Sequence, residues 1–107
     1  MAPRLLSLPA VTVLHSVASG VRYGFQIIDA TGLPTGTVYP ALSRLERDGF
    51  VRSAWEHART AQAEKRPRRR YYQITAQGER VLDDALRRYR ALAPVGAPAM
   101  PVPSRAR

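Results

Sequence analysis

The sequence predicts a mainly helical fold with one small β-hairpin, an α+β arrangement of the winged helix-turn-helix type followed by a C-terminal helix. A short helix over residues 23–30 and an amphipathic helix over residues 35–48 meet at a turn containing Gly32 and Pro34, which is the skeleton of a helix-turn-helix. Two segments rich in β-forming residues then flank the Arg-dense run 58–69, which predicts a hairpin with a basic loop, the wing.

The first helix is predicted over residues 5–19, which are apolar on nearly every side, and Gly20 ends it. A helix that covers a core with one face does not need apolar residues all round. We therefore expect its own domain to cover one side of this helix and a second subunit to cover the other.

The second helix is predicted over residues 23–30. Its apolar side chains Phe25, Ile27 and Ile28 are available for the core. Residues 31–34 then form a turn, because Gly accepts left-handed dihedral angles and Pro disfavours the helical conformation in the residue before it.

The third helix, residues 35–48, has two different faces, and Gly49 supplies its stop. At about 100° per residue, its apolar side chains share one stripe that faces the core. These side chains are Val38, Ala41, Leu42 and Leu45. The opposite face is small, polar and cationic. It consists of Gly36, Tyr39, Pro40, Ser43 and Arg47, with Thr37 and Arg44 on the flanks. Such a face fits the major groove of DNA, where short side chains allow close approach to base edges.

The hairpin is predicted from strands near residues 50–57 and 70–75, with a long mobile loop between them, because that loop has no hydrophobic periodicity. Within the second strand, Tyr71 and Tyr72 point to opposite faces, so one of them is expected in the core. Thr75 is expected to cap the last helix.

The domain boundaries follow from these elements. Residues 1–74 form the winged helix-turn-helix domain and 75–93 form a C-terminal dimerisation helix with apolar residues at three- and four-residue spacing. Residues 94–107 hold four Pro and no acidic residue, so we expect a disordered tail.

The charge of the chain is concentrated in the wing. Lys and Arg number 17 against 8 Asp and Glu, a net charge of +9, and all but Lys65 are Arg. Residues 57–72 carry six of these basic residues and a single acidic one, whereas residues 1–56 are nearly balanced. Such a concentration of positive charge indicates either a surface whose electrostatic field attracts a polyanion or a run of charged side chains that is simply solvated.

Composition excludes several classes of protein. There is no Cys, which excludes disulfides and thiolate metal sites. No apolar run approaches the roughly 20 residues of a membrane span, and the N-terminus does not resemble a secretion signal. We therefore expect a cytoplasmic protein without membrane contact, whose 107 residues form one small domain that benefits from oligomerisation.

Three motifs together resemble the signature of PadR-type transcriptional regulators. They are YGFQI at 23–27, GTVYPALSRLERDGFV at 36–51 and RPRRRYYQITAQGERVL at 66–82. The resemblance covers residues 8–92 and fits the short class, which lacks a large C-terminal helical domain. Two positions depart from the family pattern. Lys65 stands where a Gly is usual, and Pro34 stands where a Ser or Thr usually caps the helix, which leaves Thr35 or Thr37 to cap it.

The resemblance implies a homodimeric, sequence-specific DNA-binding regulator, a repressor, that reads a pseudo-palindromic operator in double-stranded DNA. The residues expected to contact DNA are Tyr23, Thr35, Thr37, Tyr39, Ser43, Arg44, Arg66, Arg68 and Arg69. The residues expected at the dimer interface are Leu6, Val13, Val17, Leu82, Leu86 and Tyr89. Tyr39 has the alternative role of packing against the turn, and for Trp55 packing within the hairpin is favoured over stacking on a ligand. The resemblance also allows for a small-molecule effector, although no residue identifies one.

An enzyme is the least supported class. The sequence has no nucleophile paired with a base, no Gly-rich phosphate loop and no ligand cluster. His15 and His57 have no neighbouring ligands, so we expect no catalytic residue, no metal and no cofactor. The alternative to a DNA-binding regulator is a winged-helix interaction module that binds a protein partner or RNA.

Overall fold

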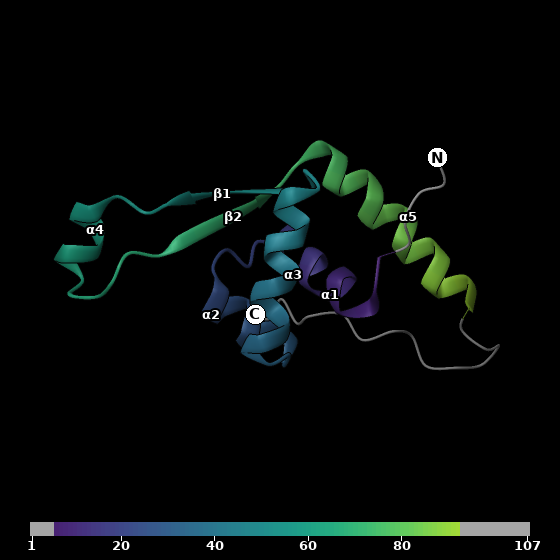
Figure 1. Cartoon of the computed structure of the whole chain (residues 1–107), viewed down its shortest axis with the longest axis horizontal. Helices are drawn as coiled ribbons and strands as arrows, with labels where there is room; N and C mark the ends of the chain where they lie inside the picture. Colours follow the sequence, from purple (N-terminus) through teal and green to yellow (C-terminus); the bar gives the residue numbers. More distant parts are fainter. Residues whose placement is uncertain (1–5, 93–107) are drawn as a thin grey trace.

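The computed structural model describes residues 6–92 of the chain, and the tail at 94–107 that was expected to be disordered lies outside the described residues. Within these described residues, five helices and two strands follow one another. They are α1 (Leu8–Ala18), α2 (Gly24–Thr31), α3 (Thr35–Arg47), β1 (Val51–Trp55), α4 (Ala58–Ala63), β2 (Arg70–Ile74) and α5 (Ala76–Leu92). The helices α1, α2 and α3 gather into one body, from which the β1–β2 hairpin extends to one side and α5 to the other (Figure 1). This order of elements confirms the predicted winged helix-turn-helix.

The core is built around α1, which contacts α2, α3, α5 and β2. From α1 the fully buried apolar side chains include Val13 and Leu14. The predicted stripe of α3 is confirmed, since Val38, Ala41, Leu42 and Leu45 are all buried. The opposite face of α3 is exposed to solvent, so the core leaves that face free.

Two details of the first helices differ from the prediction. The helix α1 begins at Leu8, because the hydroxyl of Ser7 accepts a hydrogen bond from the Ala10 amide and caps the helix there. Phe25, expected in the core, has 73% of its surface exposed. The buried position of α2 is Ile27, and a residue two places away lies on the opposite side of a helix, so Phe25 faces solvent.

The hairpin is antiparallel, with Val51 opposite Ile74 at one end and Trp55 opposite Arg70 at the other. Tyr72 is buried, whereas Tyr71 is half-buried on the other face, as the alternation of a strand predicts. The backbone at Arg22 runs beside β2 and accepts a hydrogen bond of 2.8 Å from the Tyr72 amide. This contact connects the start of α2 to the base of the wing.

The expectation of a structureless loop between the strands is wrong for half of that loop, because residues Ala58–Ala63 form α4. The Nδ1 atom of His57 accepts a hydrogen bond from the Arg59 amide and caps this helix. Three of its six residues are Ala, the strongest helix former. A helix of six residues is too short to show a hydrophobic period, which is why its pattern could not be read.

The last helix is fixed at its start by Thr75, which confirms the predicted cap. Its hydroxyl accepts a hydrogen bond from the Gly78 amide at 3.0 Å and donates one to the carbonyl of Gly49 at 2.7 Å. A methyl group at position 78 would collide with the carbonyl oxygen of Phe50 and come within 2.8 Å of Ile74 Cγ1. The absence of a side chain at Gly78 therefore lets α5 approach the start of the hairpin.

None of the helices within residues 6–92 combines the length and apolarity that crossing a bilayer requires.

Helices α1, α3 and α4 end in the same motif, in which the two amides that follow the cap residue bond back to the last turn. The residue after the cap adopts a positive φ in each case, 99° at Gly20, 82° at Gly49 and 55° at Lys65. Only Lys65 has a side chain, and a side chain makes this conformation unfavourable by roughly 1–2 kcal/mol. The departure at Lys65 is therefore a strained position in the wing.

Replacing Lys65 by Gly is expected to remove this strain and to stabilise α4. The greater freedom of Gly in the unfolded chain offsets part of the gain, so the net effect is about 0.5–1 kcal/mol. Amide hydrogen exchange in α4 measures it directly, as slower exchange in the variant.

The matched control is Gly49→Lys, which places a lysine side chain at the positive-φ position after α3, as Lys65 does after α4. The only atom near a Cβ at position 49 is Oε1 of Gln77 at 3.6 Å, so the variant tests backbone strain rather than a collision. A loss of roughly 1–2 kcal/mol in the free energy of unfolding is expected. Equal stability of both variants and the parent would show that left-handed strain is unimportant in this chain.

Candidate nucleic-acid interface

The exposed face of α3 begins at a helix end that no side chain caps. Pro34 occupies the cap position, and neither Thr35 nor Thr37 makes the expected capping hydrogen bond. The carbonyl of Pro34 instead accepts hydrogen bonds from the amides of Thr37 and Val38. The amides of Thr35 and Gly36, which precede them in the first turn, therefore remain available at the positive end of the helix dipole, an arrangement that favours a phosphate.

Tyr39 joins α3 to α2. A methyl group at Gly24 would lie within 2.6 Å of the ring atoms Cε1 and Cζ of Tyr39, so the two helices can approach this closely only because residue 24 has no side chain. The tyrosine still has 38% of its surface exposed. Packing against the neighbouring helix is thus observed, and the exposed part of the ring lies on the same face as Ser43.

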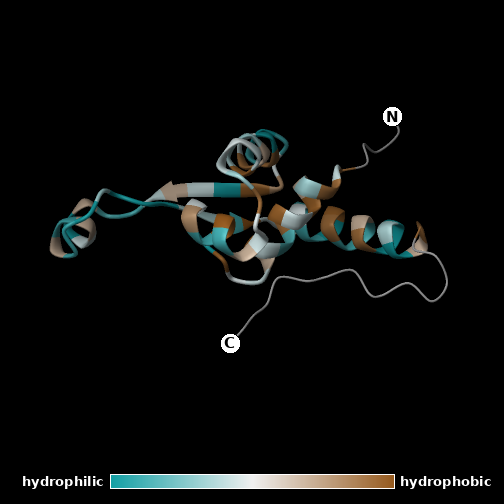
Figure 2. Cartoon of the chain, turned by 90° about the horizontal axis from the view of Figure 1, so that it is seen from below, coloured by the Kyte–Doolittle hydropathy of each residue, from teal (hydrophilic) through white to brown (hydrophobic). Residues whose placement is uncertain are grey.

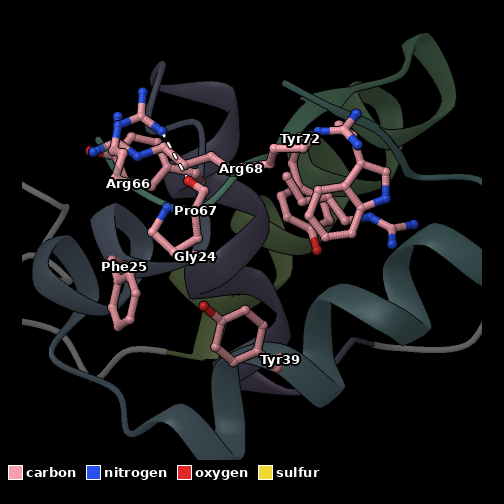
Figure 3. Close-up of a pocket in the computed structure, with 11 residues that line it drawn as sticks. Gly24, Phe25, Tyr39, Arg66, Pro67, Arg68 and Tyr72 are labelled. Atoms are coloured by element: carbon pink, nitrogen blue, oxygen red, sulfur yellow. Dashed lines mark hydrogen bonds between the residues drawn. The ribbon is translucent and has the colours of Figure 1, made fainter. Parts of the chain in front are cut away.

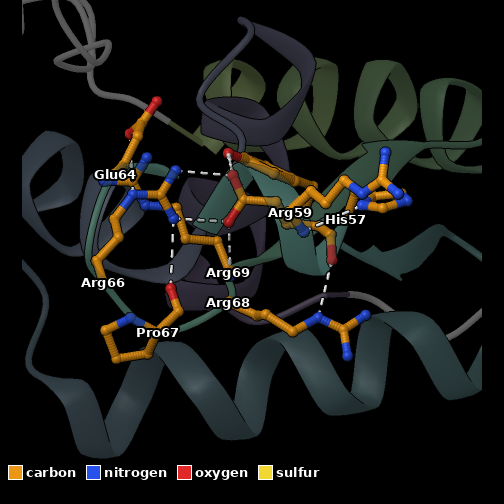
Figure 4. A network of polar contacts seen from close by, with 9 residues as sticks. His57, Arg59, Glu64, Arg66, Pro67, Arg68 and Arg69 are labelled. Atoms are coloured by element: carbon orange, nitrogen blue, oxygen red, sulfur yellow. Dashed lines mark hydrogen bonds and ion pairs between the residues drawn. The ribbon is translucent and has the colours of Figure 1, made fainter. Parts of the chain in front are cut away.

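The wing is held by the carboxylate of Glu56, which has only 7% of its surface exposed (Figure 4). Its two oxygens accept hydrogen bonds of 2.6 and 2.7 Å from Nη1 and Nη2 of Arg66. The Arg69 amide at 3.1 Å and the Tyr71 hydroxyl at 3.2 Å donate to the same carboxylate. We call this set the Glu56 latch, and it closes the loop between the two strands.

The Glu56 latch continues through the main chain. The Glu56 amide donates to the Arg69 carbonyl at 2.7 Å, and the Glu56 carbonyl accepts from Nε of Arg68 at 2.9 Å. Hydrogen bonds from Arg66 hold the pKa of the Glu56 carboxyl at about 2 against the opposing effect of burial. The same pair raises the pKa of the Arg66 guanidinium above its ordinary value. Both groups are therefore charged at neutral pH.

Among the residues predicted to touch DNA, Arg66 has a different environment from the others. Its side chain is only 18% exposed and is bound to Glu56, with a further contact of 3.1 Å to Glu64. Sequence reasoning counted Arg66 as a free cation because the partner, Glu56, lies ten residues earlier in a segment without a periodic pattern. In the folded chain Arg66 holds the wing.

Three other cations of the wing, Arg68, Arg69 and Arg70, lie on aromatic rings. The guanidinium of Arg69 lies 4.1 Å from the ring centre of Tyr23, and Tyr23 meets Tyr71 edge to face at 5.7 Å. The guanidiniums of Arg68 and Arg70 lie 5.8 and 5.5 Å from the ring of Trp55. Cation–π contacts of this kind keep a guanidinium positioned while its charge remains exposed.

Trp55 packs within the hairpin, against the side chains of Arg68 and Arg70, and is not part of the core. Its surface is 56% exposed, and it lies under two arginines at the end of β1. Glu56 is absent from the residues predicted at the site, and Arg70 was a weaker candidate for it. Arg70 reaches back to the Ser53 hydroxyl at 2.9 Å and to Glu46 of α3 at 3.5 Å, so it links the hairpin to α3.

One groove collects most of these residues between α2, α3 and the wing (Figure 3). Its volume is about 520 Å³. Its walls include five residues predicted to contact DNA, namely Tyr23, Tyr39, Arg66, Arg68 and Arg69. Thr35, Ser43 and Arg44 lie outside this groove on the exposed surface of α3, and Thr37 is half-buried beside them.

The residues expected at the dimer interface fall into two groups. Val13, Val17 and Leu82 are buried within a single chain, at 0%, 6% and 7% exposure. That part of the expectation is corrected, because side chains already buried in their own core have no surface left for a second subunit. The pattern of an all-round apolar helix arises here from contacts on several sides within one chain. Leu6, Leu86 and Tyr89 remain partly exposed, and the Tyr89 hydroxyl donates to the Leu6 carbonyl at 2.7 Å.

Comparisons with known proteins agree with this geometry. The model of the transcriptional regulator PadR-like family matches residues 13–84. A PadR-like transcription factor from Bacteroides fragilis is 24% identical with a TM-score of 0.66, covering 78% of this chain and 81% of that one. PadR family regulators from Clostridium difficile and Eggerthella lenta are 25% and 27% identical, with TM-scores of 0.64 and 0.60. They cover 78% and 79% of this chain and 88% and 78% of their own. None of the curated protein sequences is significantly similar to this one.

Acid is expected to open the Glu56 latch. The pKa of the Glu56 carboxyl is about 2 in the folded wing against an ordinary value of 4.5. Because the folded pKa is lowered, the stabilisation is complete above pH 4.5 and is lost as the pH falls toward 2. Trp55 is the only Trp of the chain and lies beside the latch, so its fluorescence reports the opening.

The control for this titration is Glu56→Gln, which keeps the shape of the side chain and removes its charge. The variant is expected to show a looser wing at neutral pH and no further change in Trp55 fluorescence between about pH 4.5 and 2. An unaltered acid transition in the variant would assign the transition to other carboxyl groups.

Proposed function

This chain belongs to the transcriptional regulator PadR-like family, and we propose that it acts as a dimeric, sequence-specific repressor that binds a pseudo-palindromic operator. In this proposal α3 enters the major groove, and the wing lies on the adjacent minor groove or its phosphates. The observation that carries the proposal is the continuity of the exposed face of α3 with the arginines of the wing across one groove. One strand of a DNA duplex can run along both the exposed face of α3 and the arginines of the wing.

The proposed contacts divide by chemistry. Arg68 and Arg69 of the wing, with Tyr23 at the start of α2, would hold phosphates, because they place a charge or a hydroxyl at the edge of the groove, where Arg68 is exposed and Arg69 and Tyr23 are half-buried. The readers of base edges would lie on α3. They are Thr35, Thr37, Tyr39, Ser43 and Arg44, with small or extended polar side chains near the helix start. Arg66 has a supporting role in this scheme, since its guanidinium is bound to Glu56.

The dimer would form through the surface where α5 meets the segment before α1. Leu6, Leu86 and Tyr89 are partly exposed there, and Leu92 is 72% exposed. This surface lies on the opposite side of the helical body from the wing (Figures 1 and 2), so two chains could meet there and leave both wings free. The recognition helices of such a dimer would read half-sites about one helical turn apart.

Replacing Arg68 and Arg69 together by Ala is expected to weaken binding to all DNA sequences alike. If six to eight contacts in the dimer neutralise phosphates, the logarithm of affinity falls with the logarithm of salt concentration at a slope of about −5 to −7. Removing two Arg from each protomer reduces the slope to about −2 to −4. Thr37→Ala and Ser43→Ala are expected instead to change the sequence preference. This is measured by selecting the duplexes that the protein binds from a random pool and sequencing them.

The control with the same change in charge is Arg87→Ala with Arg88→Ala. These arginines pair with Asp83 and Asp84 on α5, away from the groove. Their removal is expected to leave the salt slope within about one unit of the parent. Equal effects of both pairs would mean that net charge alone drives binding, and a nearly flat salt dependence would favour an interaction module for protein.

Placing a charge in the proposed dimer surface is expected to produce monomers. Leu86→Asp would leave an unpaired carboxylate inside the interface, which is strongly unfavourable. Because Leu86 also touches the core of its own chain, Leu92→Asp serves as a second variant at an exposed position. Light scattering gives the mass of each, and circular dichroism checks that the helices remain.

Phe25→Asp is the matched control, since it places the same charge on an exposed apolar residue beside the wing. It is expected to keep the mass of a dimer. A dimeric mass for both Leu86→Asp and Leu92→Asp would place the interface elsewhere.

A further inference from the structure

Three side chains join the C-terminal end of α3 to the hairpin. The hydroxyl of Ser53 on β1 donates a hydrogen bond of 2.7 Å to Oε2 of Glu46, and it accepts one of 2.9 Å from Nε of Arg70 on β2. Nη2 of Arg70 lies 3.5 Å from Oε1 of the same glutamate. A hydroxyl has one proton to donate and lone pairs with which to accept, so Ser53 can serve both partners at once. We call these three residues the Glu46 brace.

The Glu46 brace holds β1 from the side of α3, whereas the segment before α2 holds β2. The Tyr72 amide of β2 donates to the Arg22 carbonyl at 2.8 Å, and Tyr71 forms a β-bridge with Tyr23. An attachment along β2 alone leaves the hairpin free to turn about that strand. Because Ser53 lies on the other strand, its bond to α3 opposes this turn.

Directional contacts are needed here because apolar packing does not fix an angle. Val51 and Tyr72 at the base of the hairpin belong to the same buried cluster as Leu42 and Leu45 of α3. Burial of apolar surface is non-directional, whereas a hydrogen bond weakens steeply away from its preferred geometry. The hairpin reaches far out from α3 (Figure 1), so a small turn at its base displaces its outer part by a larger distance.

Arg70 differs from the nearby Arg68 in what surrounds its charge. The guanidinium of Arg70 is held by Glu46 and Ser53 and lies 5.5 Å from the ring of Trp55. Arg68 has no carboxylate within ion-pair distance among residues 6–92. The charge of Arg70 is therefore compensated within the protein, and that of Arg68 is open to a phosphate.

From these contacts we propose that the Glu46 brace sets the angle between α3 and the wing, and that Arg70 is a positioning residue that holds this angle and does not itself contact DNA. The inference rests on the proposed function, in which α3 and the wing reach the same duplex together. A protein whose binding-competent arrangement is only partly populated binds with an affinity reduced by that fraction. A wing held at one angle keeps this fraction high, and a loose wing lowers it.

The angle can be measured without DNA. The chain has no Cys, so Asp29→Cys on α2 and Thr60→Cys on α4 introduce the only two sites for spin labels. Both residues are exposed and lie outside the brace. The labelled chain is diluted with excess unlabelled chain, so that no assembly carries two labelled copies, and double electron–electron resonance gives the distribution of distances between the labels. Ser53→Ala, which removes the hydroxyl without changing charge, and Arg70→Ala are each expected to broaden this distribution.

A conservative variant and a matched control accompany this measurement. Ser53→Thr keeps a hydroxyl and is expected to retain the distribution of the parent. Ser19→Ala removes a hydroxyl that bonds back to the His15 carbonyl at the end of α1, at 2.9 Å, and is expected to leave the distribution unchanged. Circular dichroism checks that every variant keeps its helices.

Binding to a duplex selected from a random pool is then measured at several salt concentrations. Arg68→Ala is expected to make the salt slope shallower by about 2, since one phosphate contact is lost from each of two protomers. Arg70→Ala and Ser53→Ala are expected to keep the slope of the parent within about one unit and to weaken binding roughly two- to tenfold, the value of one hydrogen bond. Arg88→Ala, which removes an ion-paired arginine from α5, is expected to change neither the slope nor the affinity.

Three results would overturn the inference. If neither Ser53→Ala nor Arg70→Ala broadens the distance distribution, the brace does not set the angle. If Arg70→Ala makes the salt slope as shallow as Arg68→Ala does, Arg70 contacts phosphate. If Ser53→Thr behaves as Ser53→Ala does, the hydroxyl is not the link. A parent chain that binds no duplex counts instead against the proposed function, and the distance measurement still decides whether the brace sets the angle.

Discussion

The rest of the wing depends on the hydrogen bonds that the carboxylate of Glu56 accepts. Residues 57–72 carry six cationic side chains, and a segment with this charge would be extended by its own repulsion in the absence of a compensating group. Glu56 lies at its start with only 7% of its surface exposed and accepts hydrogen bonds from Arg66, Arg69 and Tyr71. One buried negative charge thus turns a repulsive segment into a closed loop.

The closure has consequences on both sides of the wing. Toward its tip, α4 occupies the chain between Glu56 and Arg66, so the latch shortens the free part of the loop and lowers the entropy lost in ordering it. Toward the helical body, the Arg69 amide is fixed by Glu56 while its guanidinium lies on Tyr23 at the start of α2. The wing is therefore positioned relative to α2 and α3 before any ligand arrives, and such preorganisation lowers the entropy cost of binding.

The parts of this structure that sequence could predict are those governed by local periodicity. The stripe of Val38, Leu42 and Leu45 follows from the angle between successive helical residues, and the division between Tyr71 and Tyr72 follows from strand alternation. Both rules need only neighbouring residues. The order of the elements other than α4 could be predicted for the same reason, together with the family motifs that mark the turns.

The remaining features depend on contacts that local patterns do not encode. An apolar residue such as Val13 looks the same whether its own chain or a second subunit covers it, and only the arrangement of α1 among its neighbours decides this. The pairing of Glu56 with Arg66 crosses an irregular segment, so a charge count treats Arg66 as free. The position of Trp55 beneath Arg68 and Arg70 depends likewise on how the second half of the hairpin folds back on the first.

The arginines of the wing divide into one that holds its structure and two whose charge has no carboxylate partner. Arg66 is the best-partnered cation of the wing, and its neighbours Arg68 and Arg69 have no carboxylate within ion-pair distance among residues 6–92. If every arginine were paired, the wing would be ordered but electrically neutral, and if none were paired it would be charged but unordered. Glu56 gives order and charge together. Its carboxylate binds the Arg66 side chain through both oxygens and accepts from the Arg69 amide, and its main-chain carbonyl accepts from Nε of Arg68. The guanidiniums of Arg68 and Arg69 therefore stay without a carboxylate partner among residues 6–92 while the wing is closed.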